Sequence, residues 1–370
     1  MVCKMTLSRR NFIKLIGTSA IATGTLGASI IETQKPHVKE ARYYRALDNN
    51  LVECLLCPNR CILRKNSTGS CGVRVNHDGK LYTLVYGKLC SINNDPVEKK
   101  PLYHFLPGSN AISVATPGCN LHCKFCQNHT ISQAKPNQIT TRYVSPKRLI
   151  ATAQKYNSPM VAYTYSEPTI FYEYMYDTAS INSDVKNVMI SAGYIEEEPL
   201  KNLCQVLDGI KIDLKSFSND FYRNLVSGQL EPVLRSLRII NESNTWLEIV
   251  YLVIPTQNDN MEDIKKMSEW IVKNLGPDVP IHFTRFHPSY LMKNLPPTPI
   301  DTLDNAYSTA RKAGINYVYI GNLPSHRGSD TICPGCGKNL ISRRGFLISE
   351  KSLNNGKCPD CNRKIPGVWT

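Results

Sequence analysis

The sequence lacks two features that would explain its high positive charge. The formal charge of the 370 residues is +14, yet the sequence has no dense block of lysine and arginine and no stripe that combines basic and aromatic residues. Proteins that bind nucleic acid typically concentrate their charge in such a patch. We therefore attribute the charge to solubility and to attraction for small anionic molecules.

Repeats, low-complexity tracts and long apolar stretches are also missing from most of the chain. The sequence has no internal repeat, which argues against a solenoid, and after residue 31 no stretch is long and apolar enough to span a bilayer. Hydrophobic residues make up 42% and charged residues 20% of the chain, as in ordinary globular proteins. A chain of this length can form one large domain or two to three modules.

The N-terminus, residues 1–34, is the exception to this pattern. The stretch "SRRNFIK" from Ser8 to Lys14 is followed by an uncharged stretch from Leu15 to Ile31. Together they resemble a twin-arginine export signal, although no clear small-x-small cleavage site follows. The alternative is a helical N-terminus that directs no export.

Cysteine is abundant, with fourteen residues. A disulfide framework suits small secreted domains with weak cores, so it is not expected in a chain of this size. Tight CxxC-type spacing instead favours metal or cluster ligands, which indicates reducing conditions. Cys3, Cys90 and Cys204 are assigned as ordinary thiols. The other eleven form three sets: Cys54, Cys57, Cys61 and Cys71; Cys119, Cys123 and Cys126; and Cys333, Cys336, Cys358 and Cys361.

The middle of the chain alternates between short β-rich runs and helical stretches, from about residue 111 to residue 323. Such alternation predicts parallel strands joined by right-handed crossovers. Six or seven units favour an α/β fold with a partial or full (β/α) barrel over an open sheet. We expect a signal segment, an N-terminal four-cysteine module, the barrel and a C-terminal metal-binding module, over residues 1–34, 42–104, 105–326 and 330–370.

Polar side chains follow several of the predicted strands. The three-cysteine loop follows the first run, Glu167 the second, Asp213 and Lys215 lie at the fourth, and His287 follows the sixth. Because the carboxyl ends of parallel strands meet at one face of a barrel, where active sites lie, we expect these side chains to share a site.

The loop Cys119-x3-Cys123-x2-Cys126 supplies only three thiolates. A structural zinc ion needs a fourth ligand, which His122 or His129 offers. Proteins usually cap each iron of a [4Fe–4S] cluster with a thiolate, so three thiolates leave one iron open. An open iron can bind the amino and carboxylate groups of S-adenosylmethionine (SAM) and pass an electron to its sulfonium. The loop therefore indicates radical SAM chemistry.

Further motifs match a narrower group and span residues 42 to 369. The sequence resembles the AmmeMemoRadiSam radical SAM enzymes, relatives of the pyruvate formate-lyase activating enzymes. The matching motifs are "CLLCPNRC", "GKLYTLVYGK", "PVEKKPLYHFLPG", "GCNLHCKFCQN", "AYTYSEPTIFYEY", "DGIKIDLKSF", "FHPSYLMKNLPPTP", "YVYIGN", "CPGCGKNLISRRGF" and "GKCPDC…IPGVW".

The resemblance implies roles for individual residues. Cys119, Cys123 and Cys126 would hold the [4Fe–4S] cluster. The backbone of Phe125 would contact the adenine of SAM, and Glu167 would contact its amino group. Asp213 and Lys215 would lie near its carboxylate, and His287 near its ribose. Ser191 matches part of a Thr-Asn-Gly turn of the family. The family segment Gly-Gly-Glu reads Tyr165-Ser166-Glu167 here, so the acid is kept and both glycines are lost.

Structural alternatives exist for several of these residues. Glu167, which precedes Pro168, is also typical of a helix N-cap. His287, between Phe and Pro, is also typical of a core histidine, and Lys215 of a residue in a salt bridge within the barrel. The tyrosines of "YTYSEPTIFYEYMY" are expected to pack in the core.

The two outer cysteine sets differ in clarity. Cys333-x2-Cys336 and Cys358-x2-Cys361 form two knuckles, typical of a zinc-ribbon or rubredoxin-like site that holds zinc or a single iron. Metal binding would stabilise this forty-residue module. The spacing of Cys54, Cys57, Cys61 and Cys71 fits neither two knuckles nor a common ferredoxin run. We expect zinc or an auxiliary cluster there.

The expected function is cleavage of SAM to a 5′-deoxyadenosyl radical that abstracts hydrogen from an unidentified substrate. The alternatives are activation of a glycyl-radical enzyme and a non-catalytic zinc-ribbon protein. Expected partners are flavodoxin or ferredoxin as electron donor and, from the resemblance, Memo-type and AMMECR-type proteins. The chemistry is expected in the cytoplasm, with membrane attachment or export left open by the N-terminal segment.

Overall fold

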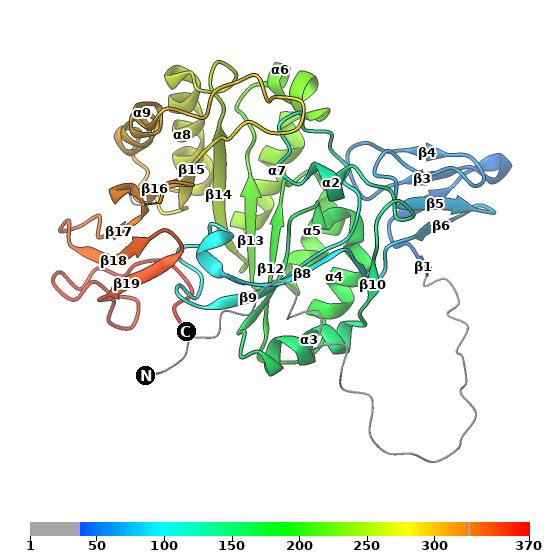
Figure 1. Cartoon of the computed structure of the whole chain (residues 1–370), viewed down its shortest axis with the longest axis horizontal. Coiled ribbons are helices and arrows are strands. Elements are labelled where there is room, and N and C mark those ends of the chain that lie inside the picture. Colours follow the sequence, from blue (N-terminus) through cyan, green and yellow to red (C-terminus); the bar gives the residue numbers. More distant parts are fainter. Residues whose placement is uncertain (1–37, 325) are drawn as a thin grey trace, which may run out of the picture. The chain divides into compact units, whose positions relative to one another are not determined.

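An eight-stranded sheet forms the centre of the computed structural model, which describes residues 38–324 and 326–370 (Figure 1). The predicted signal segment lies outside the described residues. The strand order is β16-β15-β14-β13-β12-β11-β9-β8. The strands are β8 (Ser91–Pro96), β9 (Asn110–Ala115), β11 (Met160–Tyr163), β12 (Lys186–Ser191), β13 (Gly209–Asp213), β14 (Trp246–Val253), β15 (Ile281–Arg285) and β16 (Val318–Gly321).

The sheet is a partial barrel. Strands β9 to β16 pair in parallel, while β8 runs antiparallel to β9. In the described part of the chain β8 and β16 are edge strands, so the sheet does not close on itself. The predicted α/β fold is confirmed, with the partial form of the barrel.

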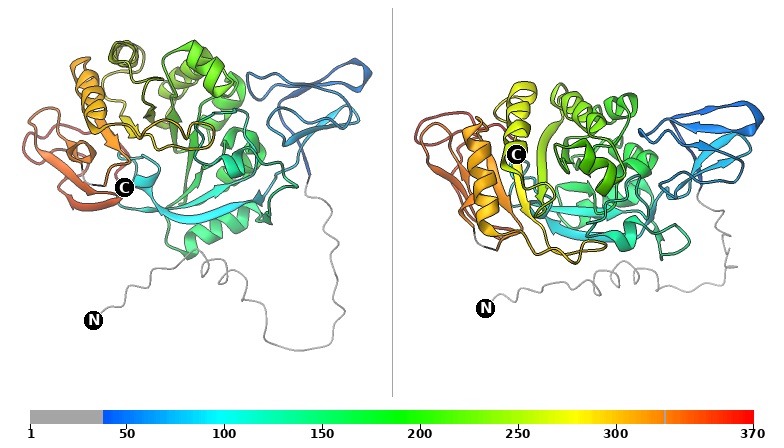
Figure 2. Two further views of the ribbon diagram at one scale, coloured as in Figure 1. Left: turned by 45° about the horizontal axis from the view of Figure 1, so that its top comes forward. Right: turned by 90° about the horizontal axis from the view of Figure 1, so that it is seen from above.

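Helices alternate with the parallel strands and lie along the outer face of the sheet (Figure 2). They are α2 (His129–Ser132), α3 (Pro146–Lys155), α4 (Tyr172–Ala179), α5 (Glu197–Cys204), α6 (Asn219–Phe221), α7 (Leu230–Asn241), α8 (Met261–Leu275) and α9 (Ile300–Lys312). Shorter turns are the 3₁₀ turns η1 (Asp48–Asn50), η2 (Val97–Lys99), η3 (Pro168–Phe171) and η5 (Arg327–Ser329), and the π-helical turn η4 (Tyr222–Val226).

Local sequence explains where several helices begin. Asn260 caps α8 by accepting hydrogen bonds from the backbone N–H groups of Glu262 and Asp263, at 2.8 and 3.3 Å. Ser145 caps α3, and Pro146 occupies its first turn. The helical stretch expected after residue 167 is instead divided into η3 and α4, because Phe171 leaves the helical backbone conformation (φ −111°, ψ 38°).

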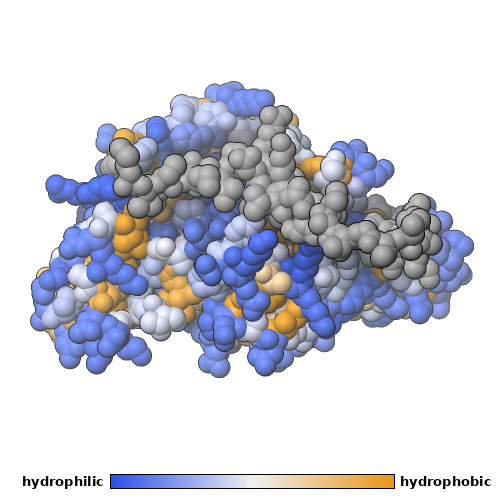
Figure 3. All heavy atoms as spheres, turned by 60° about the horizontal axis from the view of Figure 1, so that its bottom comes forward, coloured by the Kyte–Doolittle hydropathy of each residue, from blue (hydrophilic) through white to orange (hydrophobic). Residues whose placement is uncertain are grey.

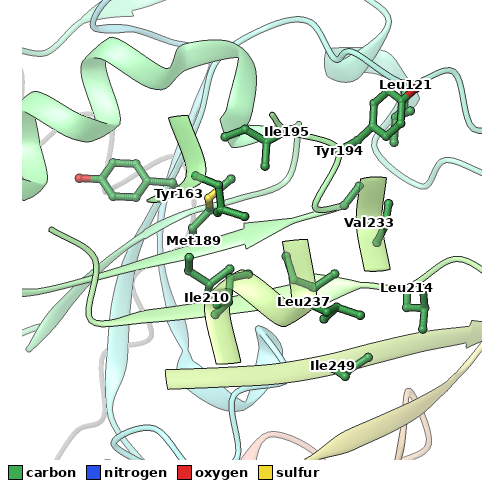
Figure 4. Close-up of a cluster of buried hydrophobic side chains, with 14 of the residues drawn as sticks. Leu121, Tyr163, Met189, Tyr194, Ile195, Ile210, Leu214, Val233, Leu237 and Ile249 are labelled. Atoms are coloured by element: carbon green, nitrogen blue, oxygen red, sulfur yellow. The ribbon is translucent and has the colours of Figure 1, made fainter. Parts of the chain in front are cut away.

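The main hydrophobic core lies between the outer face of the sheet and the helices. Figure 4 shows part of this layer, in which strand residues Met189, Ile210 and Ile249 face Val233 and Leu237 of α7. All five side chains are buried. Because successive strand residues point to opposite faces, the neighbours of these residues point to the inside of the barrel.

The inside of the barrel is filled near the amino ends of the strands by the segment that follows β8. Phe105 packs there with Ala111, Met160 and Val188. A Cβ atom at Gly209 would lie only 3.1 Å from the Phe105 ring. Glycine at the start of β13 therefore permits the close approach of this plug.

The N-terminal module consists of small sheets. Their strands are β1 (Lys39–Glu40), β2 (Tyr44–Ala46), β3 (Val52–Cys54), β4 (Ile62–Leu63), β5 (Arg74–His77), β6 (Lys80–Thr83), and the pair β7 (Lys88–Leu89) and β10 (Arg142–Tyr143). Strands β5 and β6 form an antiparallel hairpin, and Asp78 and Gly79 at its tip both have positive φ, 49° and 79°.

The C-terminal module is a three-stranded sheet of β17 (Thr331–Ile332), β18 (Asn339–Arg344) and β19 (Leu347–Lys351). Its buried residues Leu340 and Ile341 pack with Tyr103, Tyr317 and Tyr319, which joins the module to the amino ends of the barrel strands. Residues 38–370 thus form one compact unit.

Apolar groups on the surface are scattered. On the face shown in Figure 3, hydrophobic residues form separate patches within a hydrophilic surface. Among the described residues, no helix is both long and apolar enough to cross a bilayer. The large exposed hydrophobic residues are Val38, Ile62, Leu291, Ile300, Ile332, Phe346 and Leu347.

Candidate active site and metal centres

The three-cysteine loop follows β9 at the carboxyl end of the parallel strands. Cys119, Cys123 and Cys126 are free, half-buried thiols. The Cys119 sulfur accepts a hydrogen bond from the backbone N–H of Leu121 at 3.4 Å, and the Cys126 sulfur lies 3.3 Å from the Ser132 hydroxyl. The three thiols are therefore presented by one loop on the side of the barrel where the sequence placed them.

Backbone contacts fix the shape of this loop. The N–H groups of His122 and Lys124 donate to the carbonyls of Val226 and Leu225, both at 2.9 Å, and the Lys124 carbonyl accepts from Leu291 N–H at 2.9 Å. Contacts from two directions therefore hold the loop that carries the thiols.

The histidines that could have completed a zinc site have other partners. His122 is exposed and its Nδ1 lies 2.7 Å from Gln133 Oε1. The His129 ring stacks on Tyr290 with 4.6 Å between centroids, and its Nδ1 lies 3.2 Å from the Cys126 carbonyl. In the described part of the chain, neither histidine comes together with the three thiols as a compact single-ion site.

The surroundings of Cys119 and Cys123 favour the protonated thiol. Burial raises the pKa of Cys119 well above its usual value, and the Glu167 carboxylate raises it further. Burial also raises the pKa of Cys123 to about 12, although Lys215 opposes the shift. A bound metal reverses this preference, because a coordinating thiol loses its proton. Glu167 and Lys215 follow β11 and β13, which run parallel to β9, so they lie at the same end of the sheet as the thiols.

Glu167 is held at the end of β11 by its own neighbours. Its Oε1 accepts hydrogen bonds from Thr169 N–H (3.1 Å), Thr169 Oγ1 (2.8 Å) and Ser191 Oγ (2.5 Å), and its Oε2 accepts one from Ala192 N–H (2.8 Å). The N-cap interpretation is therefore correct for Glu167. A carboxylate offers about four lone-pair sites, two on each oxygen, so Oε2 retains the capacity to accept from an ammonium group.

Asp213 lies between two lysines at the end of β13. Its Oδ2 is 2.9 Å from Lys215 Nζ, and its Oδ1 pairs with Lys211 Nζ. Burial alone would raise the pKa of the Asp213 carboxyl, but the two lysines outweigh it and lower the pKa to about 2. Lys215 thus forms the predicted salt bridge, while its charge also faces the thiol of Cys123.

Lys211 is a site residue that the sequence analysis missed. It is 4% exposed and shares the inward face of β13 with Asp213, two residues later. The signal was present, because Lys211, Asp213 and Lys215 alternate with the apolar residues Ile210, Ile212 and Leu214. Burial lowers the pKa of Lys211, while the Asp213 carboxylate opposes this shift.

A second inward-facing group was also missed. Lys100 is 3% exposed, and its Nζ lies 2.6 Å from Asp95 Oδ2 and 3.4 Å from the Tyr165 hydroxyl. Tyr165 also donates to Asp95. Burial lowers the pKa of Lys100 to about 8, with Asp95 opposing the shift. Acidic and basic groups therefore alternate along the inner wall of the barrel.

The remaining predicted contacts have different surroundings. The Phe125 side chain is buried and packs on Phe221 with 5.7 Å between ring centroids, which leaves its backbone for the predicted adenine contact. His287 is exposed in the loop after β15, so the core-histidine alternative is wrong for it. That loop touches the cysteine loop, since Ser289 Oγ donates to the Cys126 carbonyl at 3.3 Å.

Four of the five tyrosines in residues 163–176 pack in the core, as expected, whereas Tyr165 is half-buried and pairs with Asp95 instead. Tyr163, Tyr172 and Tyr174 are fully buried, and Tyr176 packs against the same cluster.

The C-terminal quartet converges on one point. The sulfurs of Cys333, Cys336, Cys358 and Cys361 all lie within 4.8 Å of one another, and the pairs Cys333–Cys361 and Cys336–Cys358 are 3.5 Å apart. Zinc–sulfur bonds of about 2.3 Å place tetrahedral thiolates roughly 3.8 Å apart. The quartet therefore fits a single tetrahedral ion, either zinc or iron.

The two knuckles of this quartet have the same backbone pattern. Cys333 N–H donates to Lys338 O and Gly337 N–H to Cys333 O, while Cys358 N–H donates to Arg363 O and Asn362 N–H to Cys358 O, at 2.8 to 2.9 Å. Burial would raise the pKa of Cys358, but the backbone N–H groups of Cys361 and Asp360 contribute to a value of about 7. Such amides favour thiolate ligands.

The N-terminal quartet is arranged differently. Cys54, Cys57, Cys61 and Cys71 line one pocket, as the shared-site prediction requires. In the described part of the chain, no three of their sulfurs lie within 4.8 Å of one another.

Comparison with known proteins supports the chemistry that this geometry suggests. Residues 113–271 match the family model of the radical SAM superfamily. The chain is also 43% identical, over 334 residues, to an uncharacterized protein of Methanocaldococcus jannaschii, in an alignment that covers 89% of this chain and 99% of that protein. The chain belongs to the radical SAM superfamily. Membership implies an enzyme that cleaves SAM with the help of an iron–sulfur cluster.

Comparison with solved structures also found matches of low identity. A domain of a pyruvate-formate lyase-activating enzyme from Bacteroides vulgatus is 15% identical with a TM-score of 0.36, and the match covers 42% of this chain and 91% of that chain. A radical SAM methyltransferase from Sphaerobacter thermophilus is 14% identical with a TM-score of 0.46, and the match covers 59% of this chain and 68% of that chain.

The residues of this radical SAM chain fit both groups that the superfamily implies. Three free thiols on one fixed loop are the donor set for a [4Fe–4S] cluster with one open iron. Glu167 Oε2 can accept from an ammonium group, and Lys215 carries a positive charge suited to a carboxylate. The amino and carboxylate groups of SAM therefore have candidate partners at the same end of the sheet as the thiols.

Proposed function

We propose that this protein is a radical SAM enzyme of the AmmeMemoRadiSam type that abstracts hydrogen from its substrate. The observation that carries the proposal is that the loop of Cys119, Cys123 and Cys126 follows β9, while Glu167 and Lys215 follow the parallel strands β11 and β13 at the same end of the sheet. The match to the superfamily favours this enzyme over a non-catalytic zinc-ribbon protein.

When bound, the cluster supplies an electron to the sulfonium of SAM, and cleavage of SAM yields a 5′-deoxyadenosyl radical that takes a hydrogen atom from the substrate. The chain's own residues bind and orient SAM. Glu167 Oε2 accepts from the amino group, Lys215 contacts the carboxylate, and Asp213 fixes Lys215 through their 2.9 Å ion pair.

Two predicted contacts complete the SAM site. The Phe125 backbone contacts adenine, and His287 contacts the ribose from the loop that touches the cysteine loop. Ser191 acts indirectly, because its hydroxyl donates to Glu167 and orients the carboxylate. The roles of Phe125 and His287 are those that the resemblance of the sequence to AmmeMemoRadiSam enzymes implies.

The physiological partners follow from the same proposal. A low-potential flavodoxin or ferredoxin provides the electron, and Memo-type or AMMECR-type proteins are partners or targets of modification. The alternative, activation of a glycyl-radical enzyme, predicts a glycyl doublet in the EPR spectrum of a partner protein.

Formation of 5′-deoxyadenosine by anaerobically reconstituted protein tests the enzyme assignment. Wild type should form 5′-deoxyadenosine from SAM and dithionite, and Cys123→Ala should fall to background because the cluster loses a ligand. Cys204→Ala is the matched control, since this thiol lies at the end of α5, outside the site. Equal turnover by wild type and Cys123→Ala would refute the proposal.

A further inference from the structure

The four N-terminal cysteines share a pocket. Cys54, Cys57, Cys61 and Cys71 line one pocket, which is partly open to solvent. Arg74 and Asn120 also line this pocket. Four thiols that line one pocket can serve together as ligands of a single bound group.

The two quartets of this chain differ in the distance between their sulfurs. In the C-terminal quartet all four sulfurs lie within 4.8 Å of one another, as a single ion requires. In the N-terminal quartet no three of them do, within the described part of the chain. A cubane cluster offers a separate iron to each thiolate, so its ligands need not converge on one point. The wider spacing therefore fits a cluster.

The backbone leaves this pocket free beside two of the thiols. A Cβ atom at Gly69 would lie 3.5 Å from the Cys61 sulfur and 3.9 Å from the Cys71 sulfur. Glycine at this position keeps a methyl group out of the region next to these sulfurs.

Arg74 provides an independent indication of a bound anionic group. It is 1% exposed, and its Nη2 donates to both oxygens of the buried Glu173, at 2.7 and 2.8 Å. Its Nε and Nη1 are buried and have no partner in the described part of the chain. Buried donors without acceptors are costly. Sulfur atoms of a cluster in the pocket that Arg74 lines would supply these acceptors and be stabilised by its charge.

The pocket adjoins the loop that holds the SAM-binding cysteines. Gly118, directly before Cys119, has a φ of +99°, and a Cβ atom there would lie only 2.7 Å from the Cys71 carbonyl oxygen. Asn59 Nδ2 donates to the Asn120 carbonyl at 2.8 Å. The N-terminal quartet is thus packed against the backbone on which the first cluster is mounted.

We propose that Cys54, Cys57, Cys61 and Cys71 bind a second [4Fe–4S] cluster, fully ligated by thiolates, with Arg74 donating hydrogen bonds to its sulfur atoms. Zinc at this position would require the four sulfurs to collapse toward one point, and it would leave the Arg74 donors without the sulfides of a cluster. The C-terminal quartet, by contrast, holds the single ion.

Metal and sulfide content of the full chain tests this proposal independently of catalysis. Wild type, purified and reconstituted without oxygen, should contain about eight iron and eight sulfide per chain and about one zinc or one further iron. The triple variant Cys119→Ala/Cys123→Ala/Cys126→Ala should retain about four iron and four sulfide. About four iron in wild type, with two zinc and an iron-free triple variant, would overturn it.

A spectroscopic measurement adds a second criterion. The reduced triple variant should show a [4Fe–4S] EPR signal that SAM leaves unchanged, because every iron already has a thiolate. A signal that shifts on addition of SAM would contradict full ligation. Adding Cys57→Ala and Cys71→Ala to the triple variant should remove the signal, whereas adding Cys90→Ala should not. If reconstituted wild type formed no 5′-deoxyadenosine while the triple variant retained four iron, the proposed enzyme function would be refuted and the second cluster would stand.

Discussion

The two ends of the parallel strands use the same residue types for opposite purposes. At the amino end, Glu248 accepts hydrogen bonds from Tyr103 N–H, His104 N–H, Trp246 Nε1 and His282 Nε2, at 2.7 to 3.0 Å. At the carboxyl end, where the free thiols also lie, Glu167 retains acceptor capacity on Oε2. Glu248 at the amino end is saturated by donors of the protein itself, while Glu167 at the carboxyl end keeps capacity for a ligand.

The amino end of the parallel strands also contacts the C-terminal module. Arg343 of β18 is fully buried, donates to the carbonyls of Ser329 and Tyr103, and lies 4.0 Å above the Tyr103 ring. Its Nε is 3.9 Å from the buried carboxylate of Glu98. The comparison teaches that a buried charge whose main partners come from the protein itself, as those of Glu248 and Arg343 do, serves to join parts of this chain.

The largest effect expected from this comparison is on stability at the amino end. Arg343→Met should lower the free energy of unfolding by about 3–5 kcal/mol, because Glu98 is left buried without a counter-charge. Arg344→Met, an exposed neighbour on the same strand, should change it by less than about 0.5 kcal/mol. Urea denaturation of both variants measures the difference, and similar midpoints for the two would contradict a stabilising role for the buried arginine.

The second expected effect is a pH dependence of stability at the same end. Burial lowers the pKa of His104 to about 4; its Nδ1 donates to the Pro366 carbonyl at 2.7 Å, and its Nε2 accepts from the Tyr319 hydroxyl. The unfolded chain takes up this proton near pH 6.5, so stability is complete above that pH. It should fall by about 2 kcal/mol between pH 6.5 and 5.

Urea denaturation at pH 7 and pH 5 checks this expectation in wild type and His104→Gln. The variant should lose less stability over the interval than wild type, because the titrating group is absent. Loss of bound metal at pH 5 lowers the stability of both proteins, so it does not change the difference between them. An equal loss in the two proteins would show that His104 does not carry the effect.

At the carboxyl end, the expected effect is on the affinity for SAM. Glu167→Gln should weaken SAM binding about tenfold, because the ammonium group loses a charged acceptor. Asp208→Asn, which precedes β13 at the opposite end of the strands, should leave the affinity unchanged. Anaerobic equilibrium binding to cluster-loaded protein measures both, and equal dissociation constants would remove Glu167 from the SAM site.

The smallest expected effect comes from the residue that orients Glu167. Ser191→Ala removes one hydrogen bond, of 2.5 Å, to Oε1 and leaves the charge in place, so SAM affinity should fall by about threefold. The exposed Ser180→Ala, at the end of α4, should have no effect. A tenfold loss from Ser191→Ala would instead indicate direct contact between this hydroxyl and SAM.

The sequence was informative where function depends on spacing within one segment. The three-cysteine loop and the C-terminal knuckles were recognisable because their ligands lie within a few residues of one another. Helix α8 likewise has local signals at its bounds, since Asn260 caps it and its apolar residues recur with helical periodicity. His287 shows the limit of such reasoning, because a histidine between Phe and Pro was compatible with the core, yet it is exposed.

Contacts between distant segments were not predictable in the same way. The pairing of Arg74 with Glu173 spans 99 positions, and the contact of Arg343 with Tyr103 spans 240. The burial of Lys211 depends on which face of β13 points inward, and alternation along the strand does not say which face that is. Register and packing decide these points.

By itself, the sequence determined the superfamily chemistry, the alternation of strands and helices, and which cysteines belong together. These are local properties, fixed by side-chain type and by spacing along the chain. The tertiary structure alone decided that one quartet closes to 3.5 Å contacts while the other lines a pocket. The physical reason is that the distance between sulfurs in space depends on how whole strands and loops pack, which spacing along the chain does not fix.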